Sequence, residues 1–83
     1  MPELSAAERE RLPDEAFAYI DSQGGRHLPI GDAEHVRNAI ARFGQTRFES
    51  WEARQRAAHR ILAAARRYGI AVDPEDDVSR AAR

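Results

Sequence analysis

Residues 16–44 read AFAYIDSQGGRHLPIGDAEHVRNAIARFG, and this stretch decides the fold. Its first part, residues 16–20, is short, aromatic and β-branched, which is typical of a strand. Ser22-Gln23-Gly24-Gly25 follows with turn-forming residues, because glycine adopts positive φ without a steric clash. Residues 26–30 return as a second strand, and Pro29 places it at a sheet edge because proline has no N–H to donate. The sequence therefore predicts a β-hairpin.

The same stretch continues into a helix. Asp32 is a good N-cap, and Gly44 is expected to end the helix as its C′ residue. Between them, apolar side chains recur at positions i, i+3, i+4 and i+7, which places them on one helical face. This face consists of Val36, Ala39, Ile40 and Phe43. A hairpin is marginal alone, so we expect the face to pack against it.

A second, longer helix is predicted from Trp51 to about Tyr68. Ser50 is its expected N-cap, and Gly69 ends it. Phe48, in the connection before it, is expected to insert into the core. The apolar face of this helix is predicted to hold Trp51, Ala58, Ile61, Leu62, Ala65 and Tyr68. The expected fold class is α+β: a β-hairpin packed against two antiparallel helices.

The two ends of the chain carry weaker signals. Ser5-Ala6-Ala7-Glu8 has the form of a capping box, which predicts a short N-terminal helix through about Leu12. Residues 73–83 are acidic and alanine-rich, and we expect them to form a frayed, disordered tail. Residues 1–72 are then a single small domain.

The composition indicates in which cellular compartment the protein is expected. The 83-residue chain has no cysteine, and it has no apolar run near the ~20 residues that a membrane-spanning helix needs. No secretory signal is visible at the N-terminus, so we expect a cytoplasmic protein with no membrane contact. The net charge of −1 hides a pattern: residues 26–67 carry nine arginines and four acids, whereas both flanks are acidic.

Three segments of the sequence resemble a known family. These are LPDEAFAYID (residues 12–21), HLPI (residues 27–30) and HVRNAIARF (residues 35–43). Together with their surroundings, roughly residues 12–70, they resemble a small uncharacterised domain family. Its members occur as free-standing actinobacterial proteins and beside phage head-maturation protease regions. The resemblance implies the same hairpin and two helices, and no known activity or catalytic residue. The phage neighbours imply assembly or scaffolding work by association only.

The residue patterns do not favour catalysis or metal binding. His27, His35 and His59 are the only imidazoles, and their spacing matches no zinc motif. Ser5 and Ser50 are expected to cap helices, which occupies their hydroxyl groups. Gly24-Gly25 lies in a turn and lacks the pattern of a phosphate-binding loop. We therefore expect no enzyme activity and no cofactor.

Arginines on the second helix suggest a binding surface. Arg56, Arg60 and Arg67 lie within about 40° of one line along the helix, with the small Ala63 between them. Arg37 on the first helix is a further candidate. An ordinary amphipathic helix also has a charged outer face, but i,i+4 acidic partners are missing along 56–67. Guanidinium groups pair bidentately with phosphate, so the pattern predicts weak, sequence-independent nucleic-acid binding.

A protein partner is the alternative. Trp51, Phe48 and Tyr68 are candidates for an aromatic patch that binds a partner, and the strand with Pro29, or its partner strand, could accept an added strand. Aromatic residues at helical spacing more often pack in the core. Trp51, at the start of a helix, is nevertheless expected to stay half exposed, as is common at protein interfaces. Both partner classes remain open at this point.

Overall fold

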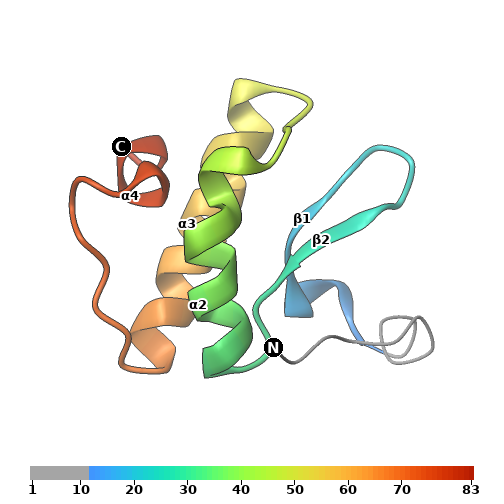
Figure 1. The fold of residues 1–83 in the computed structure, drawn as a ribbon. Coiled ribbons are helices and arrows are strands. Elements are labelled where there is room, and N and C mark those ends of the chain that lie inside the picture. The colour runs from blue at the N-terminus through green and yellow to red at the C-terminus, as the bar shows by residue number, and fades with distance from the viewer. Residues whose placement is uncertain (1–11) are drawn as a thin grey trace.

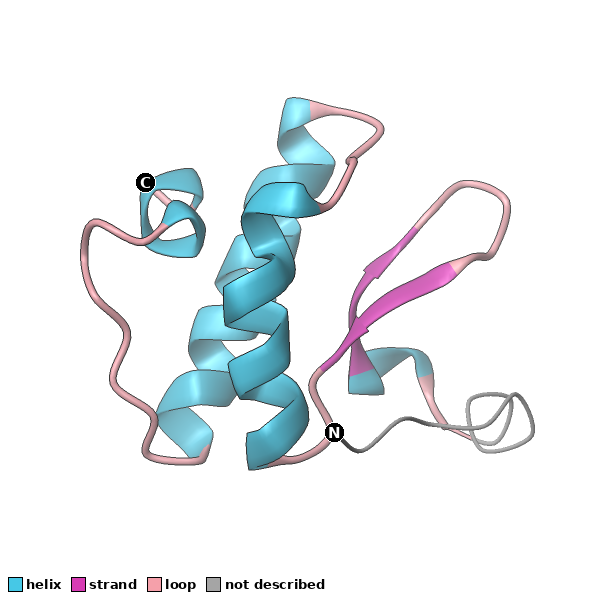
Figure 2. Ribbon diagram, viewed as in Figure 1, coloured by secondary structure: helices cyan, strands magenta, loops and turns pink. Residues whose placement is uncertain are grey.

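The computed structural model describes residues 12–83, and the helix predicted for residues 5–12 lies almost wholly outside this range. Two strands and three α-helices follow one another, with short 3-10 turns at Asp14–Ala16 (η1) and Phe43–Gln45 (η2). The hairpin lies on one side of the paired helices α2 and α3, and the C-terminal helix α4 lies on the other (Figure 1). The fold is α+β, as the sequence predicts (Figure 2).

The hairpin consists of β1 (Phe17–Ile20) and β2 (Arg26–Pro29), paired antiparallel with Tyr19 opposite His27. Gly24 has a φ of +83°, which confirms the glycine turn. Leu28 is unusual, because its φ of +58° puts a bulky residue in the left-handed region directly before a proline. Beyond it, the Ile30 N–H donates to the Ala16 carbonyl at 2.8 Å, so the pairing resumes.

Helix α2 (Ala33–Arg42) begins where the sequence predicts. The Asp32 side chain caps it by accepting from the His35 N–H. The helix also ends where predicted, because Phe43 is its C-cap and Gly44 follows as the C′ residue, but Gly44 lies inside the 3-10 turn η2 and does not have the positive φ of a helix-ending glycine. A side chain at Gly44 would instead meet the Asp77 carboxylate of α4, so the glycine leaves room for a neighbouring element. Ile40 is only partly buried at the edge of the core.

Helix α3 (Trp51–Arg67) has both of its predicted ends. The Ser50 hydroxyl accepts from the Ala53 N–H at 3.0 Å. At the other end Gly69 has a φ of +68°, and the Ile70 N–H reaches the Ala65 carbonyl at 2.8 Å, which closes a Schellman motif. The helix runs antiparallel to α2 (Figure 1). Among residues 12–83, no helix is both long and apolar enough to cross a membrane.

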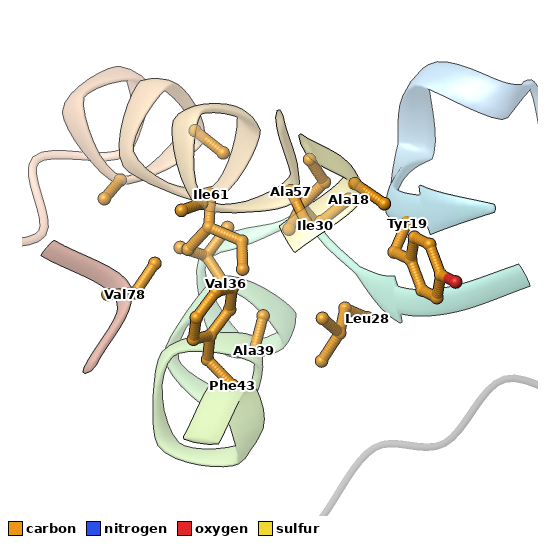
Figure 3. Close-up of a cluster of buried hydrophobic side chains, with 14 residues drawn as sticks. Ala18, Tyr19, Leu28, Ile30, Val36, Ala39, Phe43, Ala57, Ile61 and Val78 are labelled. Atoms are coloured by element: carbon orange, nitrogen blue, oxygen red, sulfur yellow. The ribbon is translucent and has the colours of Figure 1, made fainter. Parts of the chain in front are cut away.

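The expectation of a frayed, unanchored tail after Pro74 is wrong. Asp77–Ala81 forms helix α4, which packs against α3. Its Val78 is 0 % exposed and belongs to the central hydrophobic cluster (Figure 3). The Gln55 side chain of α3 also donates to the Arg83 carbonyl at 2.9 Å. Val78, the partly buried Ala81 and Ala82 and a few polar contacts therefore hold this end of the chain against the core.

The core lies between the hairpin, α2, α3 and α4 (Figure 3). Much of the part that α3 contributes is alanine, which lets the neighbouring elements come close to the helix. The predicted face of α3 is corrected here: Trp51 is 79 % exposed and Tyr68 38 %, while alanines that the prediction omitted are buried. Those alanines are Ala53, Ala57 and Ala64. Phe48 packs against Tyr19 and Phe43, as expected of a core residue.

Candidate binding groove between β1 and α3

A groove separates β1 from the exposed side of α3, and its volume is about 520 Å³. This volume falls in the range of roughly 300–1,000 Å³ that is common for ligand sites. We call it the α3–β1 groove. It is lined by Asp14, Glu15, Ala18, Tyr19, Ile20, Ile30, Ala53, Arg56, Arg60, Ala63 and Arg67.

Arg56, Arg60 and Arg67 of the predicted stripe all line this groove. Among residues 12–83, none of the three has a carboxylate oxygen within ion-pair distance. At ~1.5 Å rise per residue, Arg56 and Arg60 lie about 6 Å apart along the helix axis, and Arg67 lies about 10 Å further. The three exposed guanidinium groups therefore follow one wall of the groove.

Arg37 does not join them. It is exposed on α2 and does not line the groove. The predicted set of four arginines is thus reduced to three in one place. Helical spacing shows which residues align on one helix, but it does not show how a second helix is oriented. The position of Arg37 on α2 relative to the arginines of α3 depends on tertiary packing.

The rest of the lining is apolar or acidic. Alanine and isoleucine side chains from β1, α3 and the residue after β2 supply the apolar part of the lining, which we call the apolar floor. Asp14 and Glu15 of η1 add carboxylates, and Asp14 is paired with Arg26 at 2.8 Å. Tyr19 supplies the aromatic ring of the lining, but this side chain is buried. The groove therefore combines three arginines that have no carboxylate partner in residues 12–83, an apolar floor and two acids.

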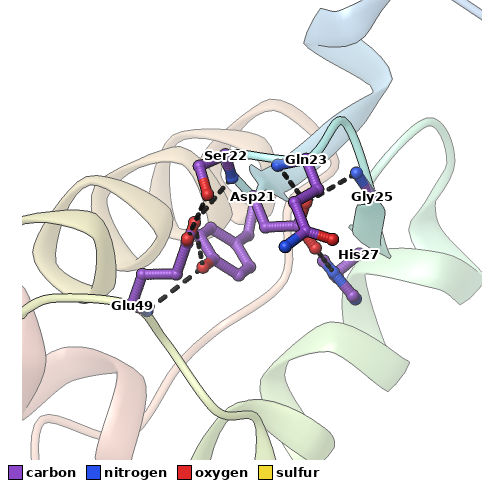
Figure 4. Close-up of polar contacts among 7 residues, drawn as sticks. Asp21, Ser22, Gln23, Gly25, His27 and Glu49 are labelled. Carbon is purple, nitrogen blue, oxygen red and sulfur yellow. Dashed lines mark hydrogen bonds and ion pairs between the residues drawn. The ribbon is translucent and has the colours of Figure 1, made fainter.

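Glu49 fixes the hairpin turn against the loop before α3 (Figure 4). Its carboxylate accepts from the Tyr19 hydroxyl at 3.1 Å and from the Ser22 N–H at 2.7 Å, and it also bonds the Ser22 hydroxyl. The hydrogen bonds from Ser22 lower the pKa of Glu49. At the other end of α3, the Tyr68 hydroxyl donates to the Gly31 carbonyl at 2.8 Å. The helix is thus fastened alongside the hairpin at both ends.

The same turn contains a second carboxylate with several partners. Asp21 pairs with the His27 ring at 2.9 Å and accepts from the N–H groups of Gln23 and Gly25 (Figure 4). The hydrogen bond from His27, followed by that from Gly25, lowers the pKa of Asp21. This network shapes the turn. The part of the network that Glu49 contributes was not visible in the sequence, because Glu49 and Ser22 are 27 positions apart.

The histidines do not converge. His27 bonds Asp21, His35 bonds Asp32 at 2.9 Å, and His59 is exposed on α3. Residues 12–83 contain no cluster of three metal-ligating side chains. His35 is more buried than a first-turn residue suggests, at 8 % exposure, and its Nε2 atom has no hydrogen-bond partner within the described part of the chain.

The aromatic patch proposed as the alternative surface is divided. Phe48 is packed against two other rings, and Pro29 pairs with Phe17 across the hairpin. Trp51 is far more exposed than the expected half, with the Arg54 guanidinium 5.5 Å from its ring centre. Tyr68 is less exposed than Trp51, and its hydroxyl donates to the Gly31 carbonyl. Trp51 therefore offers the largest free apolar surface of these candidates, but it does not line the α3–β1 groove.

A family match covers residues 4–75, well over half of the chain. Its description is "Family of unknown function (DUF6582)". The chain belongs to this family. Membership of DUF6582 confirms that most of the chain is a small domain of a family without an assigned function, as the resemblance implied. No curated protein and no solved structure matches the chain.

Proposed function

We propose that this domain is a non-catalytic binding module that holds an acidic, extended segment of a partner protein in the α3–β1 groove. The observation that carries the proposal is the row of Arg56, Arg60 and Arg67 above an apolar floor, without carboxylate partners in residues 12–83. Guanidinium groups bind carboxylates in bidentate pairs, and apolar side chains of a peptide can cover the floor.

One feature favours a peptide over the nucleic acid that the arginine stripe first suggested. Single-stranded nucleic acids usually stack their bases on accessible aromatic rings. The ring of Tyr19 is instead buried and stacked with His27 at 5.3 Å between centroids. The phage-assembly adaptor that the resemblance implied would be one form of a peptide-binding module.

The test is fluorescence anisotropy with a labelled peptide of alternating glutamate and valine, at low and physiological salt. A peptide with glutamine in place of glutamate is the matched ligand control. Each exposed charge pair contributes about 0.2–1 kcal/mol, so Arg56→Gln, Arg60→Gln and Arg67→Gln should each weaken binding up to about fivefold. Arg37→Gln and Arg66→Gln are matched protein controls, because both arginines are exposed outside the groove.

Labelled single-stranded and duplex oligonucleotides form the second arm of the experiment. Oligonucleotide binding that depends on the three groove arginines, with no peptide binding, would replace the proposal by the nucleic-acid hypothesis. The proposal also fails if the glutamate peptide does not bind at low salt, where electrostatic attraction is strongest. Equal weakening by Arg37→Gln and Arg60→Gln would show that only the overall charge matters, and would move the site away from the groove.

A further inference from the structure

The two walls of the α3–β1 groove differ in charge. The α3 wall carries Arg56, Arg60 and Arg67, whereas the opposite wall is mainly apolar along β1 and acidic at η1. The acidic residues of this second wall are Asp14 and Glu15, which come just before β1 in the chain. The charge of the second wall therefore changes along the length of the groove.

The acidic end of the second wall lies toward the C-terminal end of α3. Tyr68, the residue after α3, donates its hydroxyl hydrogen to the Gly31 carbonyl at 2.8 Å. The neighbouring Ile30 N–H donates to the Ala16 carbonyl at 2.8 Å, and Ala16 is the last residue of η1. The end of α3 and the turn η1 are thus joined through the same short segment. Among the groove arginines, Arg67 is the one at this end of the helix.

The other end of the groove has a cation but no acid in its lining. Glu49 accepts from the Tyr19 hydroxyl at 3.1 Å just before α3 begins, so the N-terminal end of α3 lies beside the end of β1. Arg56 lines the groove near this end, together with the apolar Ala53 and Ile20. A ligand in the groove therefore meets a basic end and an end where both charges are present.

Within residues 12–83, the two carboxylates of η1 differ in their ion pairs. The Arg26 guanidinium lies 2.8 Å from the Asp14 carboxylate and balances its charge. Glu15 is exposed, and no cationic side chain of these residues lies within ion-pair distance of it. A negative charge at the side of a groove attracts a cationic group of a ligand and repels an acidic one. Glu15 can therefore distinguish between ligand side chains of opposite charge.

We infer that the bound acidic segment also carries one basic residue, lysine or arginine, which pairs with Glu15. The inference rests on the proposed function and specifies the order of charges in the ligand. Successive side chains of an extended segment point to opposite sides. Acidic side chains at alternate positions face the arginines of α3, and the residues between them face β1 and η1. These intervening residues are apolar beside β1 and basic beside η1.

The spacing along α3 fits this pattern. Arg56 and Arg60 lie about 6 Å apart along the helix axis, and residues i and i+2 of an extended chain lie about 6.6 Å apart. Two acidic residues at alternate positions can therefore meet these two arginines in turn. Counted from the basic end of the groove, the ligand has these two acids first and the basic residue after them.

The experiment measures the coupling between a lysine of the peptide and Glu15 by fluorescence anisotropy on the intact chain. In two isomers of the glutamate–valine peptide, lysine replaces either the first or the last valine, which covers both directions of binding. The control peptides have glutamine at the same position. We expect at least one lysine isomer to bind about two- to fivefold more tightly than its glutamine control, which is the range of one exposed charge pair.

Variants of the chain then locate the effect. Glu15→Gln should remove the preference for lysine, and Glu15→Arg should reverse it. Glu34→Gln is the matched control, because it removes the same charge from an exposed residue of α2 that does not line the groove. The preference for lysine should persist in this control variant.

The outcomes separate the inference from the proposed function. Equal binding of the lysine and glutamine peptides in both isomers overturns the inference, but leaves the proposed function standing if the parent peptide binds. A preference for lysine that persists in Glu15→Gln, or that Glu34→Gln removes as well, also overturns it, because the lysine then does not pair with Glu15. Failure of the parent peptide to bind at low salt overturns both.

Discussion

Replacing Val78 with alanine should destabilise the whole domain, although the residue lies near the C-terminal end of the chain. Val78 is 0 % exposed and packs in the cluster that also contains Ile61 and Phe43. The substitution removes two buried methyl groups, which at ~0.8 kcal/mol each is about 1.6 kcal/mol. A remaining cavity would raise the loss, but α4 is short and can shift to close part of it.

We therefore expect a loss of about 1.5–2.5 kcal/mol in the free energy of unfolding. In a domain of this size, 1.6 kcal/mol corresponds to a fall of roughly 6–13 °C in Tm. Urea and thermal denaturation followed by circular dichroism measure both quantities. Val72→Ala is the matched control, since Val72 is only partly buried at the edge of the same core and should lose less.

The reasoning is refuted if Val78→Ala loses less than about 0.5 kcal/mol, which is the range of surface substitutions. Amide exchange gives an independent check on the same point. Protection at Val78 should approach that at Ile61, because both side chains are fully buried. Fast exchange at Val78 with slow exchange at Ile61 would mean that α4 does not stay docked in solution.

Two further perturbations test the hairpin. The pKa values of Asp21, Asp32 and Glu49 are lowered in the folded chain. The ionised carboxylates therefore stabilise the fold above their unfolded pKa values. This stabilisation is lost as the pH falls below about 4 and the carboxylates become protonated. Urea midpoints at pH 7 and pH 3 should show the drop, Asp21→Asn should reduce it, and an unchanged midpoint would contradict the assigned hydrogen bonds. Leu28→Gly should be at least as stable as Leu28→Ala, because glycine relieves the positive φ of +58° whereas alanine keeps it. The usual order in a strand is the reverse by about 0.5–1 kcal/mol, and finding that order by urea denaturation would argue against the left-handed backbone.

The local signals in the sequence were sufficient for most of the fold. Asp32, Ser50 and Gly69 mark helix ends through contacts within a few residues, and the turn at Gly24 needs only its own backbone conformation. Such short-range chemistry is visible in a single sequence. This is why the hairpin and both long helices were predicted close to their observed bounds.

What the sequence did not reveal depends on distant neighbours. Val78 is the one large apolar residue of an acidic segment, and no neighbouring residue in the sequence indicates that it packs in the hydrophobic core. Gly44 follows the C-cap of α2 as predicted, but the sequence does not show that the Asp77 side chain occupies the space where a Cβ of residue 44 would lie. Trp51 fits the helical spacing of α3 but lies outside its buried face. In each case tertiary packing overrides the local pattern.

The candidate site shows the same division. The alignment of Arg56, Arg60 and Arg67 follows from helical geometry and was predicted. Their position opposite β1, the apolar floor and the separation of Arg37 all depend on how α3 packs against the hairpin. A sequence can therefore indicate a row of charges, but the groove beside it exists only in the folded chain.

The side chains on the groove side of α3 determine both the shape and the charge of the groove: the alanines affect the shape, and the arginines supply the charge. Ala53 and Ala63 stand beside Arg56 and Arg60, so long cationic side chains rise next to positions that have only a methyl group. The short side chains of Ala53 and Ala63 therefore leave space in the groove that longer side chains at these positions would fill. Enlarging Ala63 would make the groove shallower without changing its charge, so the space available to a ligand and its attraction for acids can vary independently in this domain.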